Sequence, residues 1–186
     1  KEGRPYHVLE EIDLEEILKH GQVYRAMDLG WYPDPTYILW IAHLGNRFIA
    51  FHEVVKYKTI IPDLVEIIRD EESKLGITRT YGTYIDPTVD VHTVADIRTN
   101  KEIFEEHGIP VESSVNSREL FASVVHRALA EEVALDIPRL QIYRGNPSFG
   151  CQYLIKALPV MRYDPKKPMK MADHKHDHPV VALAYF

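Results

Sequence analysis

The sequence predicts an α/β fold built on one mixed sheet, in which three antiparallel strands are followed by parallel strands and flanked by helices. Near the N-terminus, three apolar runs at 22–29, 37–43 and 47–57 are separated only by turn-forming residues, which is typical of an antiparallel meander. After them, segments with apolar residues about every 3.6 positions alternate with short apolar runs, which is typical of α/β units. The 186 residues, 45% of them hydrophobic and 27% charged, fit one globular domain with a sizeable core.

The first half of the chain is expected to form the meander and one helix. Residues 1–20 mix acidic and aliphatic side chains and are expected to be a linker or short helix packed on a domain of residues 21–186. The second and third strands are joined at Gly45-Asn46, a turn-forming pair. A helix should follow, because Pro62 suits a first helical turn, Gly76 suits a C-terminal end, and the apolar positions share one face: Ile61, Leu64, Val65, Ile68 and Leu75.

The second half is expected to supply the α/β units. A fourth strand is predicted at 79–85, and the capping pattern from Thr99 to Glu102 predicts a helix that Gly108 ends. The remaining expected elements are a strand at 109–113, a helix opened by Asn116 and Glu119, a strand at 140–143, a helix at 147–158, a two-stranded ribbon or loop at 161–173, and a final helix begun by Pro179. The two tryptophans, Trp31 and Trp40, are expected to pack in the core or within a loop rather than to act as base-stacking groups.

Charge and cysteine content narrow the classes of function. The formal net charge of −6 disfavours nucleic-acid binding through overall positive charge, since that binding gains free energy from counterion release by Lys and Arg. A local basic segment at 156–175 predicts DNA contacts instead; the alternative is a solvated surface loop. The single cysteine excludes a disulfide framework, and without a signal peptide or long apolar run we expect a soluble intracellular protein that binds no membrane. The expected DNA-binding residues are Lys166, Lys167, Lys170 and Lys175.

Three aspartates stand where expected elements end or begin. Asp28 ends the first strand, Asp86 follows the fourth strand, and Asp177 precedes the final helix. Carboxylates suit the hard cations Mg²⁺ and Mn²⁺, and a pair of such ions can bind both the attacking and the leaving oxygen of a phosphodiester. Together the three acids therefore predict a divalent-metal site and a DNA nuclease. Taken singly, Asp28 and Asp86 are also typical turn formers, and Asp177 is also typical of an acid at a helix N-terminus.

Histidines surround the last of these aspartates. Because imidazole is a common zinc ligand, His174, His176 and His178 raise the alternative of a zinc site, but no Cys or Glu at a recognisable spacing completes it. For His176 or His178, a role in proton transfer or in phosphate contact is the other interpretation.

The order of these elements resembles that of the ribonuclease H-like nucleases, whose acids lie on the first strand, at the fourth strand and on the last helix. Within that superfamily, the chain from about Tyr24 to Phe186 resembles the C-terminal nuclease domain of the large terminase subunit of tailed bacteriophages. It departs from a common family form at Val181 and Ala184, where an acid and an arginine often stand. The resemblance depends on three patterns: Met27-Asp28-Leu29-Gly30 followed by Asp34-Pro35-Thr36; Tyr81-Gly82-Thr83-Tyr84-Ile85-Asp86-Pro87; and Arg162-Tyr163-Asp164 leading into His176-Asp177-His178-Pro179-Val180-Val181-Ala182-Leu183-Ala184-Tyr185.

This resemblance implies that Asp28, Asp86 and Asp177 are catalytic and bind two Mg²⁺ or Mn²⁺ ions, with Asp34 as an accessory ligand. It implies a metal-dependent endonuclease that cuts concatemeric viral DNA during genome packaging in the host cytoplasm. The implied partners are double-stranded DNA, the small terminase subunit, the portal and an ATPase motor domain of the same full-length chain. Since the chain begins with Lys1 and has no GxxxxGK(S/T) phosphate loop, we expect a fragment without that motor.

Two alternative functions stay open on the sequence alone. One is another ribonuclease H-like nuclease of the junction resolvase or transposase type. The other is a non-catalytic module that docks on DNA or on the portal, in which the acids are structural.

Overall fold

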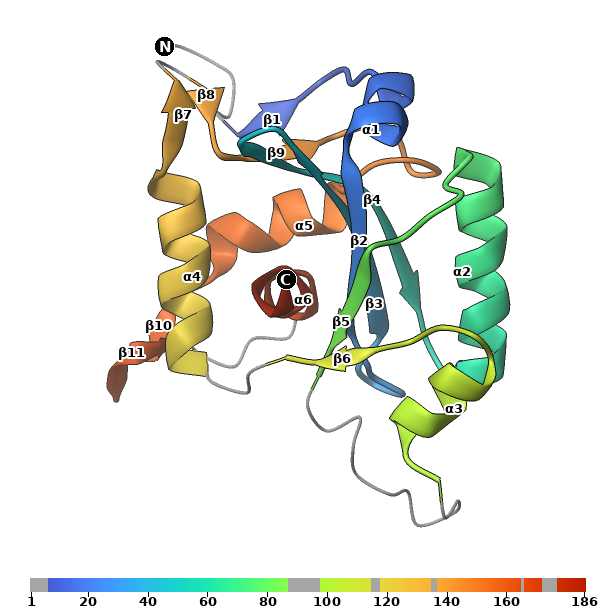
Figure 1. Ribbon diagram of the computed structural model, residues 1–186. Coiled ribbons are helices and arrows are strands. Elements are labelled where there is room, and N and C mark those ends of the chain that lie inside the picture. Colours follow the sequence, from blue (N-terminus) through green and yellow to red (C-terminus); the bar gives the residue numbers. More distant parts are fainter. Residues whose placement is uncertain (1–6, 87–97, 115–117, 135–136, 165, 172–176) are drawn as a thin grey trace.

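A seven-stranded mixed sheet forms the centre of the protein (Figure 1), in a computed structural model that describes residues 7–86, 98–114, 118–134, 137–164, 166–171 and 177–186. The strand order is β1-β9-β4-β3-β2-β5-β6. Strands β2, β3 and β4 pair antiparallel, whereas β5, β6, β9 and β1 join in parallel. The expected mixed sheet is confirmed. Its strands are β1 (Val8–Leu9), β2 (Gln22–Asp28), β3 (Thr36–Leu44), β4 (Arg47–Lys56), β5 (Gly82–Ile85), β6 (Glu112–Ser113) and β9 (Leu140–Tyr143).

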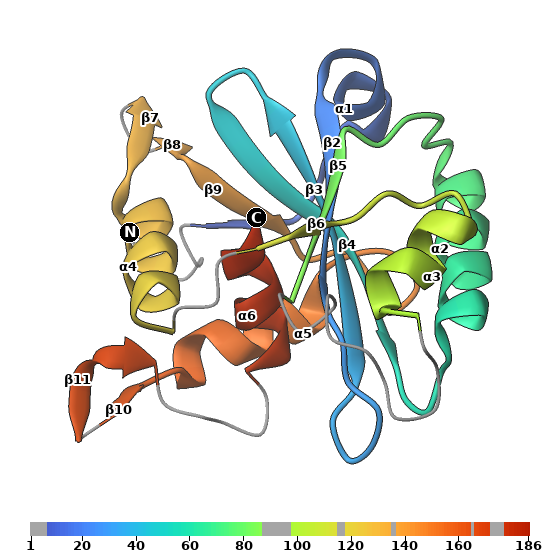
Figure 2. The ribbon, with the colours of Figure 1, turned by 60° about the horizontal axis from the view of Figure 1, so that its bottom comes forward.

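Helices cover both faces of the sheet (Figures 1 and 2). On one face lie α1 (Leu14–His20), α2 (Ile61–Leu75) and α3 (Asn100–Glu106), and on the other lie α4 (Arg118–Ala130), α5 (Gln152–Ala157) with a 3-10 turn (Leu158–Val160), and α6 (His178–Tyr185). Each face has its own apolar core, one around Trp40, Phe51 and Phe104 and the other around Tyr37 and Leu154. None of the helices in the described residues has the length and apolar character of a membrane span.

Helix α6 lies at the centre of the second core, where Figure 1 shows it end on between the sheet and α4. It contacts β2, β3 and β5 on one side and α4 and α5 on the other. The sequence explains this position, because a helix that is apolar nearly all round must be buried. The buried residues of α6 are Pro179, Val180, Val181, Ala182, Leu183 and Tyr185.

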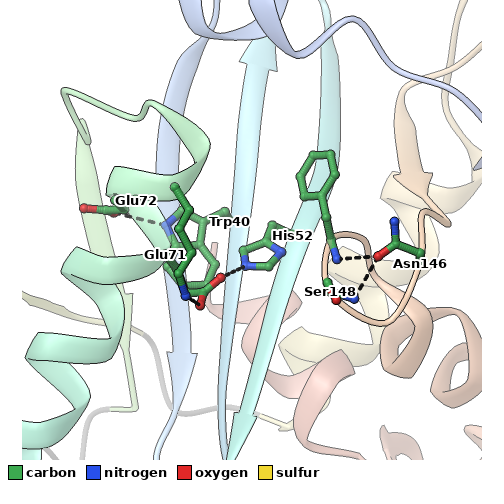
Figure 3. Close-up of polar contacts among 8 residues, drawn as sticks. Trp40, His52, Glu71, Glu72, Asn146 and Ser148 are labelled. Atoms are coloured by element: carbon green, nitrogen blue, oxygen red, sulfur yellow. Dashed lines mark hydrogen bonds and ion pairs between the residues drawn. The ribbon is translucent and has the colours of Figure 1, made fainter.

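Buried polar contacts fix α2 on the sheet (Figure 3). The indole Nε1 of Trp40 on β3 donates to Glu72 Oε1 at 3.0 Å, and Nε2 of His52 on β4 lies 3.0 Å from Glu71 Oε2. Burial lowers the pKa of His52, against the opposing effect of Glu71, so the ring is neutral near pH 7 and its Nε2–H donates to the carboxylate. These contacts fix which side of α2 faces the sheet.

Several elements differ from the sequence-based expectations. The expected strands at 79–85 and 109–113 are shorter, as β5 and β6, and the helix expected at 147–158 begins only at Gln152. The cause is a tight turn in which Asn146 Oδ1 accepts hydrogen bonds from the backbone N–H groups of Ser148 and Phe149 (Figure 3). The ribbon expected near 161–173 is present as β10 (Tyr163–Asp164) and β11 (Lys167–Met171). The small hairpin of β7 (Glu132–Ala134) and β8 (Ile137–Pro138) was not expected.

Candidate functional site

The first two predicted acids emerge side by side from neighbouring strands. Asp28 is the last residue of β2, and Asp86 directly follows β5. Strands β2 and β5 are parallel and adjacent, with Met27 paired to Ile85, so their carboxyl ends meet at one edge of the sheet. The Asp28 residue is 8% exposed and Asp86 is half-buried. The sheet topology therefore brings together two acids that are 58 positions apart in the sequence.

The third acid comes from α6. Asp177 occupies the position that precedes the first turn of this helix and is 6% exposed. The helix dipole favours a negative charge at this end. The negative charges of Asp86 and Asp177 both raise the pKa of Asp28, which shows that the three carboxyls share one electrostatic neighbourhood.

His178 is the direct partner of Asp28. Its Nδ1 lies 2.6 Å from Asp28 Oδ2, and its Nε2 lies 3.6 Å from Asp34 Oδ1. The imidazole thus bridges the first acid and the accessory acid of the loop that follows β2. The hydrogen bond to Asp28 is the largest cause of a raised pKa of His178, and the charges of Asp177 and Asp34 act in the same direction, against burial. His178 is therefore a cation over a wider pH range than a free histidine.

Burial is the main cause of the raised pKa of Asp28. The hydrogen bond and the charge of His178 lower that pKa, and the neighbouring acids Asp86 and Asp177 raise it further. Repulsion from the neighbouring acids therefore contributes to the raised pKa of Asp28, but the loss of hydration at the end of a buried strand contributes more.

Asp86 is held by the far end of α6. The hydroxyl of Tyr185 donates to Asp86 Oδ2 at 2.6 Å, and Ser114 Oγ donates to the backbone carbonyl of Tyr185 at 3.0 Å. Sequence reasoning missed both Tyr185 and the pairing of His178 with Asp28, since neither follows from local spacing. Position 178 carried one signal, its place beside Asp177 at the start of a helix.

The donor set suits a hard cation by its chemistry. Aspartate oxygens are the ligands that Mg²⁺ and Mn²⁺ prefer, and a cation would lower the raised pKa of Asp28. Within the described part of the chain, however, no group of three or more His, Cys, Asp or Glu side chains is arranged to hold a metal ion. His178 contacts Oδ2 of Asp28 and Tyr185 donates to Oδ2 of Asp86, and each carboxylate also has a second oxygen with which it could bind an ion.

The predicted DNA-binding lysines lie on and around the ribbon of β10 and β11. Lys166 is exposed at the turn of the ribbon, while the backbones of Lys167 and Lys170 form part of β11. The side chains of these two and the whole of Lys175 lie outside the described residues, as do His174 and His176 of the alternative zinc site.

Large terminases are among the solved structures with a similar architecture. The nuclease domain of the large terminase g2p from bacteriophage SPP1, solved with bound Mn, aligns with a TM-score of 0.63 and 18% identity, covering 96% of this chain and 94% of that one. The fold is that of a terminase nuclease domain. The large terminase of a thermophilic bacteriophage aligns with a TM-score of 0.72 and 16% identity, and this chain spans 41% of its length. No protein-family profile and no curated protein sequence matches the chain. The expected ribonuclease H-like fold is therefore confirmed by the terminase structures, at sequence identities that bear on the fold alone.

Proposed function

We propose that this protein is a metal-dependent DNA endonuclease that cuts concatemeric viral DNA during genome packaging. The observation that carries the proposal is the shared electrostatic neighbourhood of Asp28, Asp86 and Asp177, which come from two adjacent parallel strand ends and a helix start. Acids that crowd together at a poorly hydrated site repel one another, which is unfavourable in a protein made only for structure, whereas divalent cations would compensate their charge. The terminase-like fold supports the same assignment by analogy.

The reaction is hydrolysis of a DNA phosphodiester. Two bound Mg²⁺ or Mn²⁺ ions would supply a water of lowered pKa and would stabilise the departing 3′ oxygen. Asp28, Asp86 and Asp177 would hold these ions, with Asp34 as an accessory ligand. In the metal-free protein His178 favours the ionised form of Asp28, against the effect of burial, and orients its carboxylate. Tyr185 does the same for the orientation of Asp86 through its hydroxyl group.

The partners proposed for this activity are double-stranded DNA, an ATPase motor domain in the same full-length chain, the small terminase subunit and the portal. This chain spans 41% of the length of the thermophilic bacteriophage's large terminase. That difference in length supports the proposal that the chain is a fragment of a longer protein. Cutting in the host cytoplasm during virus assembly is part of the same proposal.

Nicking of supercoiled plasmid tests the activity. The wild-type protein should nick and linearise plasmid in Mn²⁺ and do neither with a chelator, and Asp28→Asn and Asp177→Asn should reduce cutting to the chelator level. Asp63→Asn, which replaces an exposed acid in the first turn of α2, is the matched control and should cut like the wild type. Absence of metal-dependent nicking would favour the non-catalytic docking module. Cutting of four-way junctions in preference to ordinary duplex would favour a resolvase.

A further inference from the structure

The loop between β2 and β3 displays aromatic side chains to solvent. Trp31 is 54% exposed and Tyr32 is 65% exposed, whereas the second tryptophan, Trp40, is 0% exposed. The loop projects beyond the end of the sheet (Figure 2). Trp31 thus packs in neither core, and an exposed large aromatic ring on a projecting loop is typical of a binding surface.

Hydrogen bonds close this loop at its base. Thr36 Oγ1 accepts from the N–H of Gly30 at 3.2 Å and donates to the Gly30 carbonyl at 2.8 Å, which closes the loop at its base. A Cβ atom at position 30 would lie 2.3 Å from the carbonyl oxygen of Pro35, so the close approach requires glycine. The N–H of Lys58 donates to the Trp31 carbonyl at 3.0 Å. These contacts restrict the backbone that carries the two aromatic rings, which reduces the entropy lost on binding.

The loop begins and ends at the acid cluster. Asp28 lies three positions before Trp31, and Asp34 lies three positions after it, with its Oδ1 3.6 Å from His178 Nε2. Trp31 therefore lies on the segment that joins two of the acids. This continuity separates the loop from other exposed aromatic residues such as Tyr153 on α5.

Trp31 also forms part of the wall of a groove of about 830 Å³ between this loop, the start of α2 and α3. Leu29, Ile60 and Pro62 give the groove apolar walls, and Arg98 and Asn100 give it a polar margin. Beside it, Lys58 Nζ lies 4.5 Å from the centre of the Tyr32 ring. A groove with apolar walls and the cation of Lys58 nearby matches a nucleotide, whose base has apolar faces and whose phosphate is an anion.

We propose that this groove holds an unstacked nucleobase of the DNA strand to be cut, with the indole of Trp31 as its stacking surface. The proposal rests on the proposed nuclease function and adds a substrate class to it: duplex DNA with unpaired or locally melted bases near the cut. A stacked base would anchor the DNA strand on the loop that joins Asp28 to Asp34.

Intrinsic fluorescence tests base stacking independently of cutting. The chain has two tryptophans, and Trp40 is fully buried, so quenching by an oligothymidylate reports on Trp31. Oligothymidylate should quench the tryptophan fluorescence of the wild type both with and without Mg²⁺. It should not quench the fluorescence of Trp31→Phe, which retains only Trp40. Oligothymidylate affinity, measured by anisotropy, should fall at least about fivefold in Trp31→Leu and much less in Trp31→Phe, because only phenylalanine preserves a stacking ring. Tyr153→Ala, which removes an aromatic ring 58% exposed on α5, should bind like the wild type.

Cutting in Mn²⁺ supplies the second readout. The wild type should cut a duplex with a short unpaired bubble at least about fivefold faster than the same fully paired duplex. Tyr153→Ala should keep this preference, and Trp31→Leu should lose it. Either of two results would contradict the proposed base-binding site. One is no fluorescence quenching at oligonucleotide concentrations that saturate the protein, and the other is an equal loss of affinity in Trp31→Phe and Trp31→Leu. If the wild type forms a dimer that Trp31→Ala converts to monomers, and oligothymidylate causes no quenching, the loop instead makes contacts between two copies of the chain. If the wild type cuts nothing in Mn²⁺, the nuclease proposal is wrong, and quenching alone then decides whether the base site exists.

Discussion

The Nδ1 atom of His178 lies 2.6 Å from Oδ2 of Asp28, so an imidazole compensates the buried acid at the end of β2 in the metal-free protein. The two residues are 150 positions apart and meet because α6 packs against β2 and β5. Since the same imidazole also approaches Asp34, the site contains a positive group where the proposed cations would bind. Metal affinity and protein stability are consequently linked through this pair.

Replacing His178 by Ala should destabilise the metal-free protein by on the order of 1 to 3 kcal/mol, because the Asp28 carboxylate loses a charged hydrogen-bond partner while it stays buried. The pKa of His178 is raised above its unfolded value near 6.5, so its contribution is fully present below pH 6.5 and is lost as the pH rises through the folded value. Urea unfolding with a chelator from pH 5 to 9 should show the variant and the wild type converging at high pH. A constant difference across that range would contradict this linkage.

Replacing Asp28 by Asn should stabilise the metal-free protein, since burial and neighbouring acids disfavour the charged carboxylate. Mn²⁺ at about 100 times its Kd should raise the melting temperature of the wild type by roughly 5 to 10 °C and leave that of Asp28→Asn nearly unchanged. Thermal unfolding with Mn²⁺ and with a chelator measures both effects. An equal Mn²⁺-dependent shift in the two proteins would show that the ion binds elsewhere.

His52 should impose the opposite pH dependence. Burial lowers its pKa, so the folded state holds a neutral ring, and stability is lost as the pH falls below the unfolded value of about 6.5. Removing this group in His52→Gln, which keeps an N–H donor for Glu71, should reduce the acid-side slope of the unfolding free energy by up to about 1.4 kcal/mol per pH unit. Urea titrations from pH 4 to 7 measure the slope, and parallel curves for the two proteins would argue against a neutral His52.

Combined replacement of Lys166, Lys167 and Lys170 by Ala should weaken duplex DNA binding. It should also flatten the salt dependence of binding by about one unit of slope for each DNA phosphate that the variant no longer neutralises. Anisotropy titrations over a salt series provide the measurement. The matched control replaces three lysines that lie on α1, α2 and α3, outside the basic segment: Lys19, Lys74 and Lys101. If the control weakens binding as much, the effect comes from total charge and the ribbon has no special role.

Much of the fold follows from local sequence signals. The capping box from Thr99 to Glu102 and the glycine at position 76 define helix ends that the structure reproduces, since side-chain caps and left-handed backbone are encoded within a few residues. The start of α5 is a failure of the same approach. Asn146 closes a turn with its side chain, and apolar periodicity does not detect such a contact.

The candidate site was only partly accessible from sequence. The sequence indicated that Asp28, Asp86 and Asp177 lie at the ends of secondary-structure elements. Because β2 and β5 pair in parallel, the strand ends at Asp28 and Asp86 lie side by side. The hydrogen bonds between His178 and Asp28 and between Tyr185 and Asp86 depend on how α6 packs against the sheet. Local sequence patterns do not encode this tertiary packing. Their roles in cutting stay predictions until the variants are measured.

Helix α6 follows every strand of the sheet in chain order, yet it fills the middle of one core and positions Asp177. During translation, the strands that carry Asp28 and Asp86 therefore leave the ribosome well before the segment that completes both that core and the acid cluster. A nascent chain, or one truncated ahead of residue 177, would have neither the third acid nor the apolar packing around it. Under the proposed function, the nascent chain would therefore gain nuclease activity only when α6 packs into this core.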